Sequence, residues 1–355
     1  MPSEYTIVFP ATMLWSNHQR PHHVLTQLAR RHPVRCLFND WTVDEQVQEA
    51  GRLIVTKRAL SRKYHEGPLV YYFSIPEKLD YLRRPPFPRP DLFVFELMDL
   101  PEAEFASWKK KLPKALERAD LIRTTHPRIT EYLREHYAAT LGGKPVATSY
   151  NGVDLDLFDP TVERKKPDEL ASVDKPILGF YGNLDGWIDW ALIRKLADLP
   201  DYQVVVVGGT EGMEPKIPAE LRNSSVIWVG KRPVRRMPDF LSAFDVALYP
   251  FVVNEMTDAV DPLKVWEYFA FGRPVLATPT SLVRENPPLF TTVAPGDEVD
   301  TDALDSAVRA ALASGADEEA CATRRQAAEA RDWGRVADRI HTEITEALRL
   351  RGGAK

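Results

Sequence analysis

The chain has 355 residues, of which 44% are hydrophobic and 27% are charged, and its formal net charge is −5 at pH 7. This length is typical of two domains, and the apolar share is sufficient for two hydrophobic cores. The mild negative charge excludes a general attraction to nucleic acid, so no nucleic-acid partner is expected.

Cysteine usage and hydropathy limit the cellular setting. Cys36 and Cys321 lie far apart and offer neither a metal-ligand spacing nor a disulfide framework, which favours a reducing compartment. Residues 1–6 do not resemble the start of a signal peptide, and no apolar run approaches the roughly 18 residues that span a bilayer. We therefore expect a cytoplasmic protein, and a peripheral contact with the inner face of the membrane is left open.

Short apolar strands alternate with helical patterns in the first half of the chain. The patterns predict strands at 5–9, 34–38, 69–73, 92–97, 121–125 and 146–148, and helices at 21–31 and 127–136. Strands that are separated by helices indicate βαβ units and a mostly parallel sheet.

The same alternation restarts in the second half. The charged, proline-containing stretch 159–175 predicts an interdomain linker, and a new first strand begins at residue 176. Surface helices are predicted at 300–315 and 318–350. The expected fold class is α/β, with an N-terminal domain at 1–158 and a C-terminal domain at 176–333.

One segment of the second half combines several signals of an anion site. Pro262 suits the first turn of a helix, and Lys264 and Glu267 are three residues apart, so they share one helix face. Gly272 can close that helix in a left-handed conformation, ahead of a buried strand at 274–277. Free helix amides and a lysine suit a diphosphate, and a carboxylate suits ribose hydroxyls. The alternative is an ordinary amphipathic helix with a solvated Lys/Glu pair.

This segment resembles the donor-binding signature of GT-B glycosyltransferases, particularly of family-four-type and related bacterial enzymes. Four further stretches resemble the same family in the same order, namely 150–158, 179–184, 204–209 and 229–250. The resemblance implies two Rossmann-like domains that face a cleft, the GT-B architecture. It also implies that a last helix at 334–355 packs back on the N-terminal domain.

The resemblance implies a nucleoside diphosphate sugar as co-substrate, most often UDP-linked in this family, with no resident cofactor and no metal ion. The helix amides and Lys264 would face the phosphates, and Glu267 would face the ribose. The implied donor-binding residues are Gly182, Asn183, Lys231, Arg232, Asp258, Leu263, Lys264 and Glu267.

The sequence departs from the family pattern at two positions. Ala259 stands eight residues before Glu267, where retaining members often carry a glutamate. Asn183 stands where many members carry an arginine that contacts the diphosphate, a charge that Lys231, Arg232 or Lys264 could supply. Inverting and retaining outcomes therefore both stay open, with Asp258 and Asp261 near the expected sugar position.

The N-terminal domain must supply the acceptor side. Asp99 and Glu96 lie at the carboxyl end of the predicted strand 92–97, where a carboxylate can accept the proton of an acceptor hydroxyl. Asp99 is the first candidate, and its alternative role is that of a helix cap.

The loop after the first strand is the second place of interest in this domain. It carries Trp15, Arg20 and His22, which suit sugar or anion contacts. The alternative for His22, and for its neighbour His23, is to cap the following helix or to pack against it. The lysines at 109–111 and 114 suit either anionic lipid headgroups or, preferably, a solvated face.

The sequence thus predicts a metal-independent glycosyltransferase that uses a nucleotide sugar. The expected acceptor is a glycan, a lipid-linked saccharide or a small metabolite. Two alternatives remain: a nucleotide-sugar epimerase of the same architecture, and a non-catalytic nucleotide-sugar-binding subunit.

Overall fold

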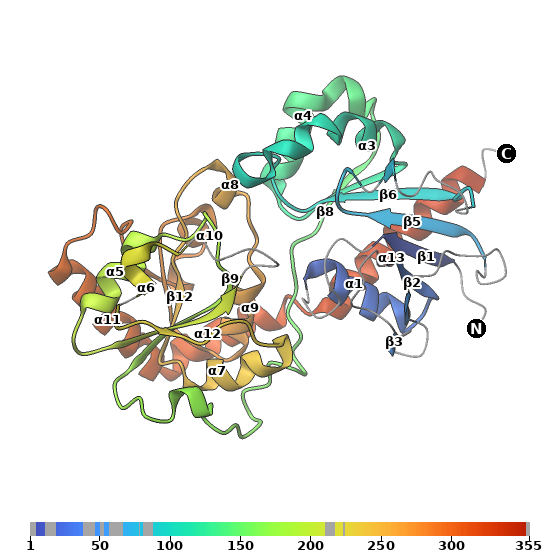
Figure 1. Cartoon of the computed structure of the whole chain (residues 1–355). Helices are drawn as coiled ribbons and strands as arrows, with labels where there is room; N and C mark the ends of the chain where they lie inside the picture. The colour runs from blue at the N-terminus through green and yellow to red at the C-terminus, as the bar shows by residue number, and fades with distance from the viewer. Residues whose placement is uncertain are drawn as a thin grey trace. The chain divides into compact units, whose positions relative to one another are not determined.

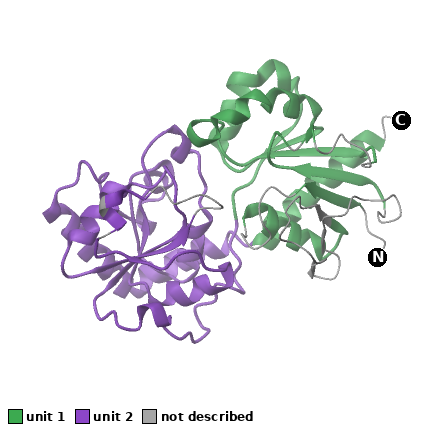
Figure 2. Cartoon of the chain, viewed as in Figure 1, with its two compact units in different colours: residues 1–151, 333–355 green, residues 152–332 purple. Residues whose placement is uncertain are grey.

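The computed structural model describes residues 5–10, 19–37, 47–49, 53–56, 67–77, 79–80, 88–209, 217–222 and 224–352 (Figure 1). Within these residues the chain forms two compact units, one of residues 1–151 with 333–355 and the other of residues 152–332 (Figure 2). The expected linker at 159–175 lies inside the second unit, because Phe158, Leu170 and Val173 are buried in the core of that unit.

Unit 1 is built on a mostly parallel sheet of eight described strands in the order β3-β4-β2-β1-β5-β6-β7-β8. All neighbours are parallel except β3 and β4. The chain runs outward from β1 to β4 and then returns to β5, so the sheet is doubly wound. The strands are β1 Thr6–Pro10, β2 Val34–Leu37, β3 Val47–Glu49, β4 Leu53–Thr56, β5 Leu69–Phe73, β6 Leu92–Leu97, β7 Leu121–Thr124 and β8 Val146–Thr148.

The last helix of the chain belongs to unit 1. Trp333 opens it and is buried, and its ring stacks on His23 with centroids 4.9 Å apart. The Tyr5 hydroxyl and His341 Nδ1 lie 2.9 Å apart and join the same helix to the first strand. The helices of this unit are α1 Arg20–Ala29, the 3-10 helix η2 Ala103–Lys110, α3 Leu112–Arg118, α4 Pro127–Leu141 and α13 Trp333–Gly352.

Unit 2 has a parallel sheet of six strands in the order β11-β10-β9-β12-β13-β14. The chain runs from β9 outward to β11, returns to β12 beside β9, and then runs outward to β14. Right-handed crossovers place α5 (Trp190–Asp198) on one face of the sheet and α9 (Leu263–Ala270) on the other (Figure 1). The strands are β9 Ile177–Asn183, β10 Gln203–Gly209, β11 Ile227–Trp228, β12 Val246–Tyr249, β13 Val275–Ala277 and β14 Thr291–Thr292.

The remaining helices of unit 2 cover this sheet and its edges. They are η3 Asp168–Leu170, α6 Ala219–Arg222, η4 Val234–Arg236, α7 Met237–Ala243, α8 Glu255–Asp258, α10 Ser281–Glu285, η5 Pro287–Leu289, α11 Thr301–Ala316 and α12 Glu318–Glu329. In the described part of the chain, none of the helices combines the length and apolarity needed to cross a membrane.

The structure differs from the predicted elements in two respects. The single helix expected at 318–350 is two helices, α12 and α13. The helix is interrupted at residues 330–332, where the chain passes from one unit to the other. The short strands β3, β4, β11 and β14 were not predicted, since two to four residues carry too little periodic pattern. Gly272 closes α9 with φ +68°, as its sequence position predicted.

The packing of β9 depends on a glycine. A Cβ built on Gly179 would lie 2.2 Å from Cγ of Phe244, whose side chain is fully buried. Gly179→Ala should therefore lower the free energy of unfolding by about 1–3 kcal/mol, the usual cost of overpacking a core, as measured by urea denaturation.

Phe244, whose ring lies against Gly179, provides the control. Combined with Phe244→Leu, which leaves room beside β9, the effect of Gly179→Ala should be smaller than in the wild-type background. Two strictly additive losses would contradict the clash.

Candidate functional site

The carboxyl ends of β9 and β12 form the switch point of the unit 2 sheet. The chain after β9 continues to β10 on one side, and the chain after β12 continues to β13 on the other side. Ligands of doubly wound sheets bind in the crevice between two such diverging connections. Pro262 is the N-cap of α9, so the helix starts at Leu263, one residue later than a proline in the first turn predicts. The first amides of α9 therefore have no partner within the helix, and the helix dipole is positive there.

Lys264 lies at this switch point. Its Nζ is 5.3 Å from the ring centroid of Phe180 on β9 and 4.8 Å from that of Phe251, which follows β12. Burial lowers the pKa of Lys264 to about 8, against an upward influence of Glu267. Among the described residues Lys264 forms no ion pair, so its charge is stabilised by two aromatic faces and by the nearby charge of Glu267.

Glu267 lies on the same face of α9 and is almost fully buried, with 7% of its surface exposed. The Tyr181 hydroxyl donates a 2.7 Å hydrogen bond to its Oε2. Burial raises the pKa of Glu267 to about 7, although the Tyr181 hydrogen bond and Lys264 oppose this effect; Asp154 adds to it. The helix thus presents a cation and a carboxylate, neither of which forms an ion pair with another described residue.

Gly182 leaves room for Lys264. It has φ +144°, a conformation that favours glycine, and a Cβ added to it would lie 2.7 Å from Cε of Lys264. Asn183 follows at the end of β9 and is half-buried. The absence of a side chain at residue 182 therefore lets Lys264 lie against the end of β9.

The two basic residues after β11 differ in their environment. Lys231 is exposed, and its Cβ lies 3.5 Å from the position of a Cβ on Gly209, at the end of β10 beside the switch point. Arg232 pairs with Glu169 on η3 at 3.0 Å, so part of its charge is already used inside the unit.

The aspartates before α9 have structural partners. Asp258 accepts a hydrogen bond from the Ser281 amide at 2.7 Å and pairs with Arg284 at 2.8 Å, which fixes the start of α10. Asp261 accepts from the Trp266 indole at 2.8 Å and pairs with Arg331 at 3.1 Å. The carboxylates of both aspartates thus already hold other groups of the unit, and the sugar position expected near them stays a prediction.

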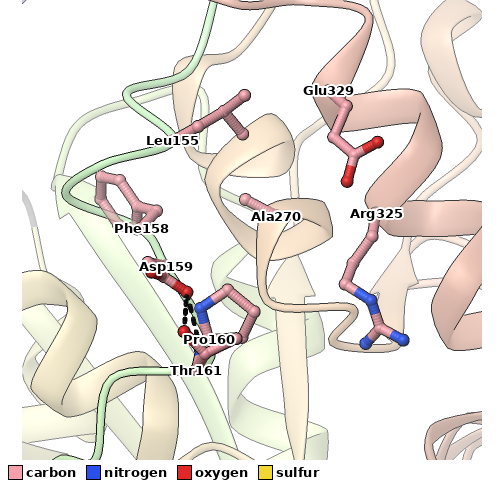
Figure 3. A pocket seen from close by; sticks show the side chains of 8 residues that line it. All are labelled: Leu155, Phe158, Asp159, Pro160, Thr161, Ala270, Arg325 and Glu329. Atoms are coloured by element: carbon pink, nitrogen blue, oxygen red, sulfur yellow. Dashed lines mark hydrogen bonds between the residues drawn. The ribbon is translucent and has the colours of Figure 1, made fainter.

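A cavity of about 580 Å³ opens at the far end of α9, where Ala270 ends the helix (Figure 3). Leu155 and Phe158 form its apolar wall, and Arg325 and Glu329 of α12 form a charged one. It lies at the opposite end of the helix from Lys264, about 9 Å along the axis at 1.5 Å per residue. It is therefore separate from the switch point.

In unit 1, Glu96 belongs to a buried ionic network. Arg20 reaches Glu96 Oε1 at 2.8 Å and Arg123 Nε reaches it at 3.3 Å, and both arginines donate to Ser149 Oγ. Arg123 also pairs with Glu343 of α13. Although burial alone would raise the pKa of Glu96, the two arginines lower it to about 2. Glu96 is consequently a poor proton acceptor, in contrast to its proposed catalytic role.

Arg20 holds the turn that follows β8. Its Nη1 donates to the Tyr150 carbonyl at 2.9 Å and to Asn151 Oδ1 at 3.1 Å, and its side chain is 3% exposed. Arg20 therefore fixes the backbone of this turn, and its contact on the acceptor side stays a prediction.

The histidines at the start of α1 also have structural roles. The Gln19 amide donates to His22 Nδ1 at 3.0 Å, which caps the helix, and His23 packs on Trp333. The capping alternative therefore describes His22, and the packing alternative describes His23. Trp15 lies outside the described residues.

Asp99 has a different environment from Glu96, three residues away. It is half-buried just beyond β6, and within the described part of the chain no hydrogen bond or ion pair engages its carboxylate. Burial raises its pKa to about 6. Such a carboxylate can accept a proton near neutral pH.

The lysine run of η2 and α3 is largely paired. Lys109 reaches Glu102 at 2.6 Å, and Lys111 and Lys114 each reach Asp80 at 2.8 Å. This arrangement agrees better with a solvated face than with a surface for anionic lipid.

Sequence reasoning missed two residues that organise these sites. Tyr181 was treated as part of a strand, and Arg123 as part of another. A charged residue inside an apolar strand, as in Leu121–Thr124, was the available signal for a buried ion pair. No comparable signal identifies the partner of Tyr181, because its bond to Glu267 spans 86 residues.

Comparisons with known proteins agree with this geometry. Residues 175–314 match a family model described as glycosyl transferases group 1. The putative teichuronic acid biosynthesis glycosyltransferase TuaH of Bacillus subtilis (strain 168) is 28% identical over 227 residues, which are 62% of this chain and 55% of the relative. The match thus spans about half the length of this curated relative.

Solved structures match nearly the whole chain. Sucrose-phosphate synthase from Thermosynechococcus elongatus has a TM-score of 0.72 at 16% identity and covers 97% of this chain and 99% of its own. The Anabaena protein HepE, solved in complex with UDP and glucose, has a TM-score of 0.64 at 15% identity and covers 96% and 100%. The predicted fold of two Rossmann-like domains, the GT-B fold, is therefore confirmed, and residues 175–314 are similar to the glycosyl transferases group 1 family.

Proposed function

We propose that the chain is a glycosyltransferase that moves a sugar from a nucleoside diphosphate sugar to an acceptor hydroxyl. The observation that carries the proposal is Lys264, a desolvated cation at the switch point of a group 1 domain, on one helix face with Glu267. Phosphates are the ligands that a lysine and free helix amides together attract.

Each donor contact has a physical basis. The amides of Leu263 and Lys264 and the Lys264 ammonium face the diphosphate, and the glycine at residue 182 leaves the space that the Lys264 side chain occupies. Asn183 and Lys231, at the same edge of the sheet, complete the phosphate side. Glu267 accepts hydrogen bonds from the ribose hydroxyls, which partly restore the solvation that its carboxylate loses on burial.

UDP is the proposed nucleotide. The solved structure of the similar Anabaena protein contains UDP and glucose, and UDP is the commonest donor nucleotide of the family that the sequence resembles. The proposed acceptor is a glycan, a lipid-linked saccharide or a small metabolite. The relative whose name refers to teichuronic acid biosynthesis supports a saccharide acceptor.

We propose an inverting transfer in which Asp99 is the general base. The acceptor hydroxyl gives its proton to the Asp99 carboxylate while its oxygen bonds to the anomeric carbon. The bond from that carbon to the diphosphate breaks at the same time, and the nucleoside diphosphate leaves with its electron pair. Ala259, where many retaining members carry a glutamate, agrees with this outcome.

The leaving diphosphate is proposed to be stabilised by α9 and Lys264, without a metal ion or other cofactor. The cytoplasm is the proposed compartment, since Cys321 is a free thiol.

The donor site predicts the effect of two substitutions. Lys264→Ala and Glu267→Ala should each weaken UDP binding by about 1.5–3 kcal/mol, the worth of a charge-assisted hydrogen bond, as measured by calorimetry. Lys165→Ala removes a lysine of the same unit that is 85% exposed, and it should leave the affinity unchanged. Equal affinities in all four folded proteins would remove the donor assignment.

Asp99 predicts a loss of turnover without a loss of binding. Asp99→Asn keeps the shape but not the proton acceptor, so the turnover number should fall by about two to four orders of magnitude with little change in donor affinity. The wild-type turnover number should rise as the pH passes about 6, since only the ionised carboxylate accepts a proton.

Glu104→Gln is the matched control for Asp99, because it neutralises an exposed carboxylate of the adjoining η2. It should leave turnover unchanged. Near-normal turnover of Asp99→Asn would contradict the inverting scheme.

Metal independence has a direct test. With an excess of EDTA over divalent ions, the transfer rate should stay within about twofold of the untreated rate, because helix amides and Lys264 stabilise the charge of the leaving diphosphate. A loss that added Mg²⁺ restores would contradict it.

A further inference from the structure

Tyr181 connects β9 to the carboxylate of Glu267. Its side chain is 4% exposed, and its hydroxyl donates to Glu267 Oε2 at 2.7 Å. The ring packs edge-on against Tyr268 with centroids 5.0 Å apart, and the Tyr181 amide donates to the Tyr268 hydroxyl at 3.3 Å. The hydroxyl of Tyr181 is therefore held in place from both its backbone and its ring.

The hydrogen bond fixes one oxygen of Glu267 and leaves the other available. Among the described residues no hydrogen bond engages Oε1, and the residue keeps 7% of its surface exposed. A glutamate has three side-chain torsions, and ordering such a side chain costs conformational entropy when ligand contacts alone must do it. Here the torsions are already restrained before a ligand arrives.

We propose that Tyr181 is a positioning residue for donor recognition, which holds the Glu267 carboxylate ready to receive the hydroxyls of a nucleotide ribose. The inference rests on the proposed function, because it assumes that Glu267 faces the donor. It adds a residue of β9 that does not touch the donor but determines how strongly and at which pH Glu267 binds it.

Four influences act on the Glu267 carboxylate. Burial raises its pKa to about 7, and Asp154 on the neighbouring segment acts in the same direction. The Tyr181 hydrogen bond and Lys264, on the same face of α9, oppose both. Of the two opposing influences, the hydroxyl of Tyr181 can be removed without a change of charge, so its contribution can be isolated.

Removal of this hydroxyl should raise the pKa of Glu267 further. A hydrogen bond to a charged group is worth enough to shift a pKa by about one unit. Ribose hydroxyls bind an ionised carboxylate best, so the decline of UDP affinity at low pH should move to a pH about one unit higher in Tyr181→Phe. At pH 7 the affinity should fall about fivefold, because the ionised fraction falls by that factor.

The first experiment uses the protein without nucleotide. The pKa of Glu267 is higher in the folded than in the unfolded chain, so its stabilising contribution is complete below about pH 4.5 and is lost as the pH rises through about 7. In Tyr181→Phe this loss should continue to about pH 8. The free energy of unfolding of both proteins is measured by denaturation from pH 5 to pH 9, and the difference between them is followed.

Two further variants isolate the carboxylate. In a Glu267→Gln background, Tyr181→Phe should add no pH-dependent difference, because no titrating group remains at residue 267. Tyr268→Phe removes the hydroxyl that receives the Tyr181 amide but leaves the bond to Glu267, so it should not move the transition. A Tyr181→Phe difference that is flat from pH 6 to pH 9 would overturn the proposal.

The second experiment measures UDP affinity by calorimetry over the same pH range. The titration of UDP itself is common to all variants and cancels in the comparison. The expected result is a shifted pH profile for Tyr181→Phe, whereas a merely structural role would lower the affinity by one factor at every pH. A uniform loss, or no loss, overturns the positioning role.

The two experiments separate this inference from the proposed function. If the wild type does not bind UDP, or if Glu267→Gln binds it equally well, the donor assignment fails whatever the first experiment gives. If the wild type binds UDP through Glu267 and Tyr181→Phe has the wild-type profile, the donor assignment stands and the inference fails.

Discussion

The site in unit 2 depends on the anchoring of α9 by Asp261. This buried carboxylate pairs with Arg331 at 3.1 Å and accepts from the Trp266 indole at 2.8 Å, and the Arg331 guanidinium lies 3.7 Å above the Trp266 ring. Loss of one partner would leave a buried charge uncompensated, which is far more costly than loss of a surface pair. The Arg331 carbonyl also accepts from the Val153 amide at 2.8 Å, so the segments by which the chain enters and leaves the unit are joined at the start of α9.

That anchor allows α9 to carry side chains that are unfavourable in isolation. Lys264 and Glu267 lie near each other, yet burial lowers the pKa of the first to about 8 and raises that of the second to about 7. Both shifts mean that the charged forms are destabilised in the folded protein. A ligand with phosphates and hydroxyls would favour both charged forms. The same two buried charges thus destabilise the free protein and strengthen the binding of the ligand.

The sequence predicted what depends on local pattern. The helix that starts after Pro262 and ends before Gly272, the strands around it and the parallel order of both sheets follow from periodicity and capping residues. It could not predict the partners of Arg20 and Glu96, which lie 76 residues apart and meet only after the sheet has formed. The sequence pattern therefore could not show that Arg20 holds the turn after β8 or that Asp261 anchors α9.

Glu96 and Asp99 demonstrate how the fold divides the roles of two carboxylates at the end of one strand. Burial alone would raise the pKa of both, but Arg20 and Arg123 reverse the effect at Glu96, whose pKa is about 2. Asp99 has no such partner among the residues that the structure describes, and its pKa is about 6. A permanently ionised, doubly paired carboxylate stabilises structure, and an unpaired one that titrates near neutrality can exchange protons. The spacing of two acids at a strand end cannot distinguish these roles, because arginines from α1 and β7 decide between them.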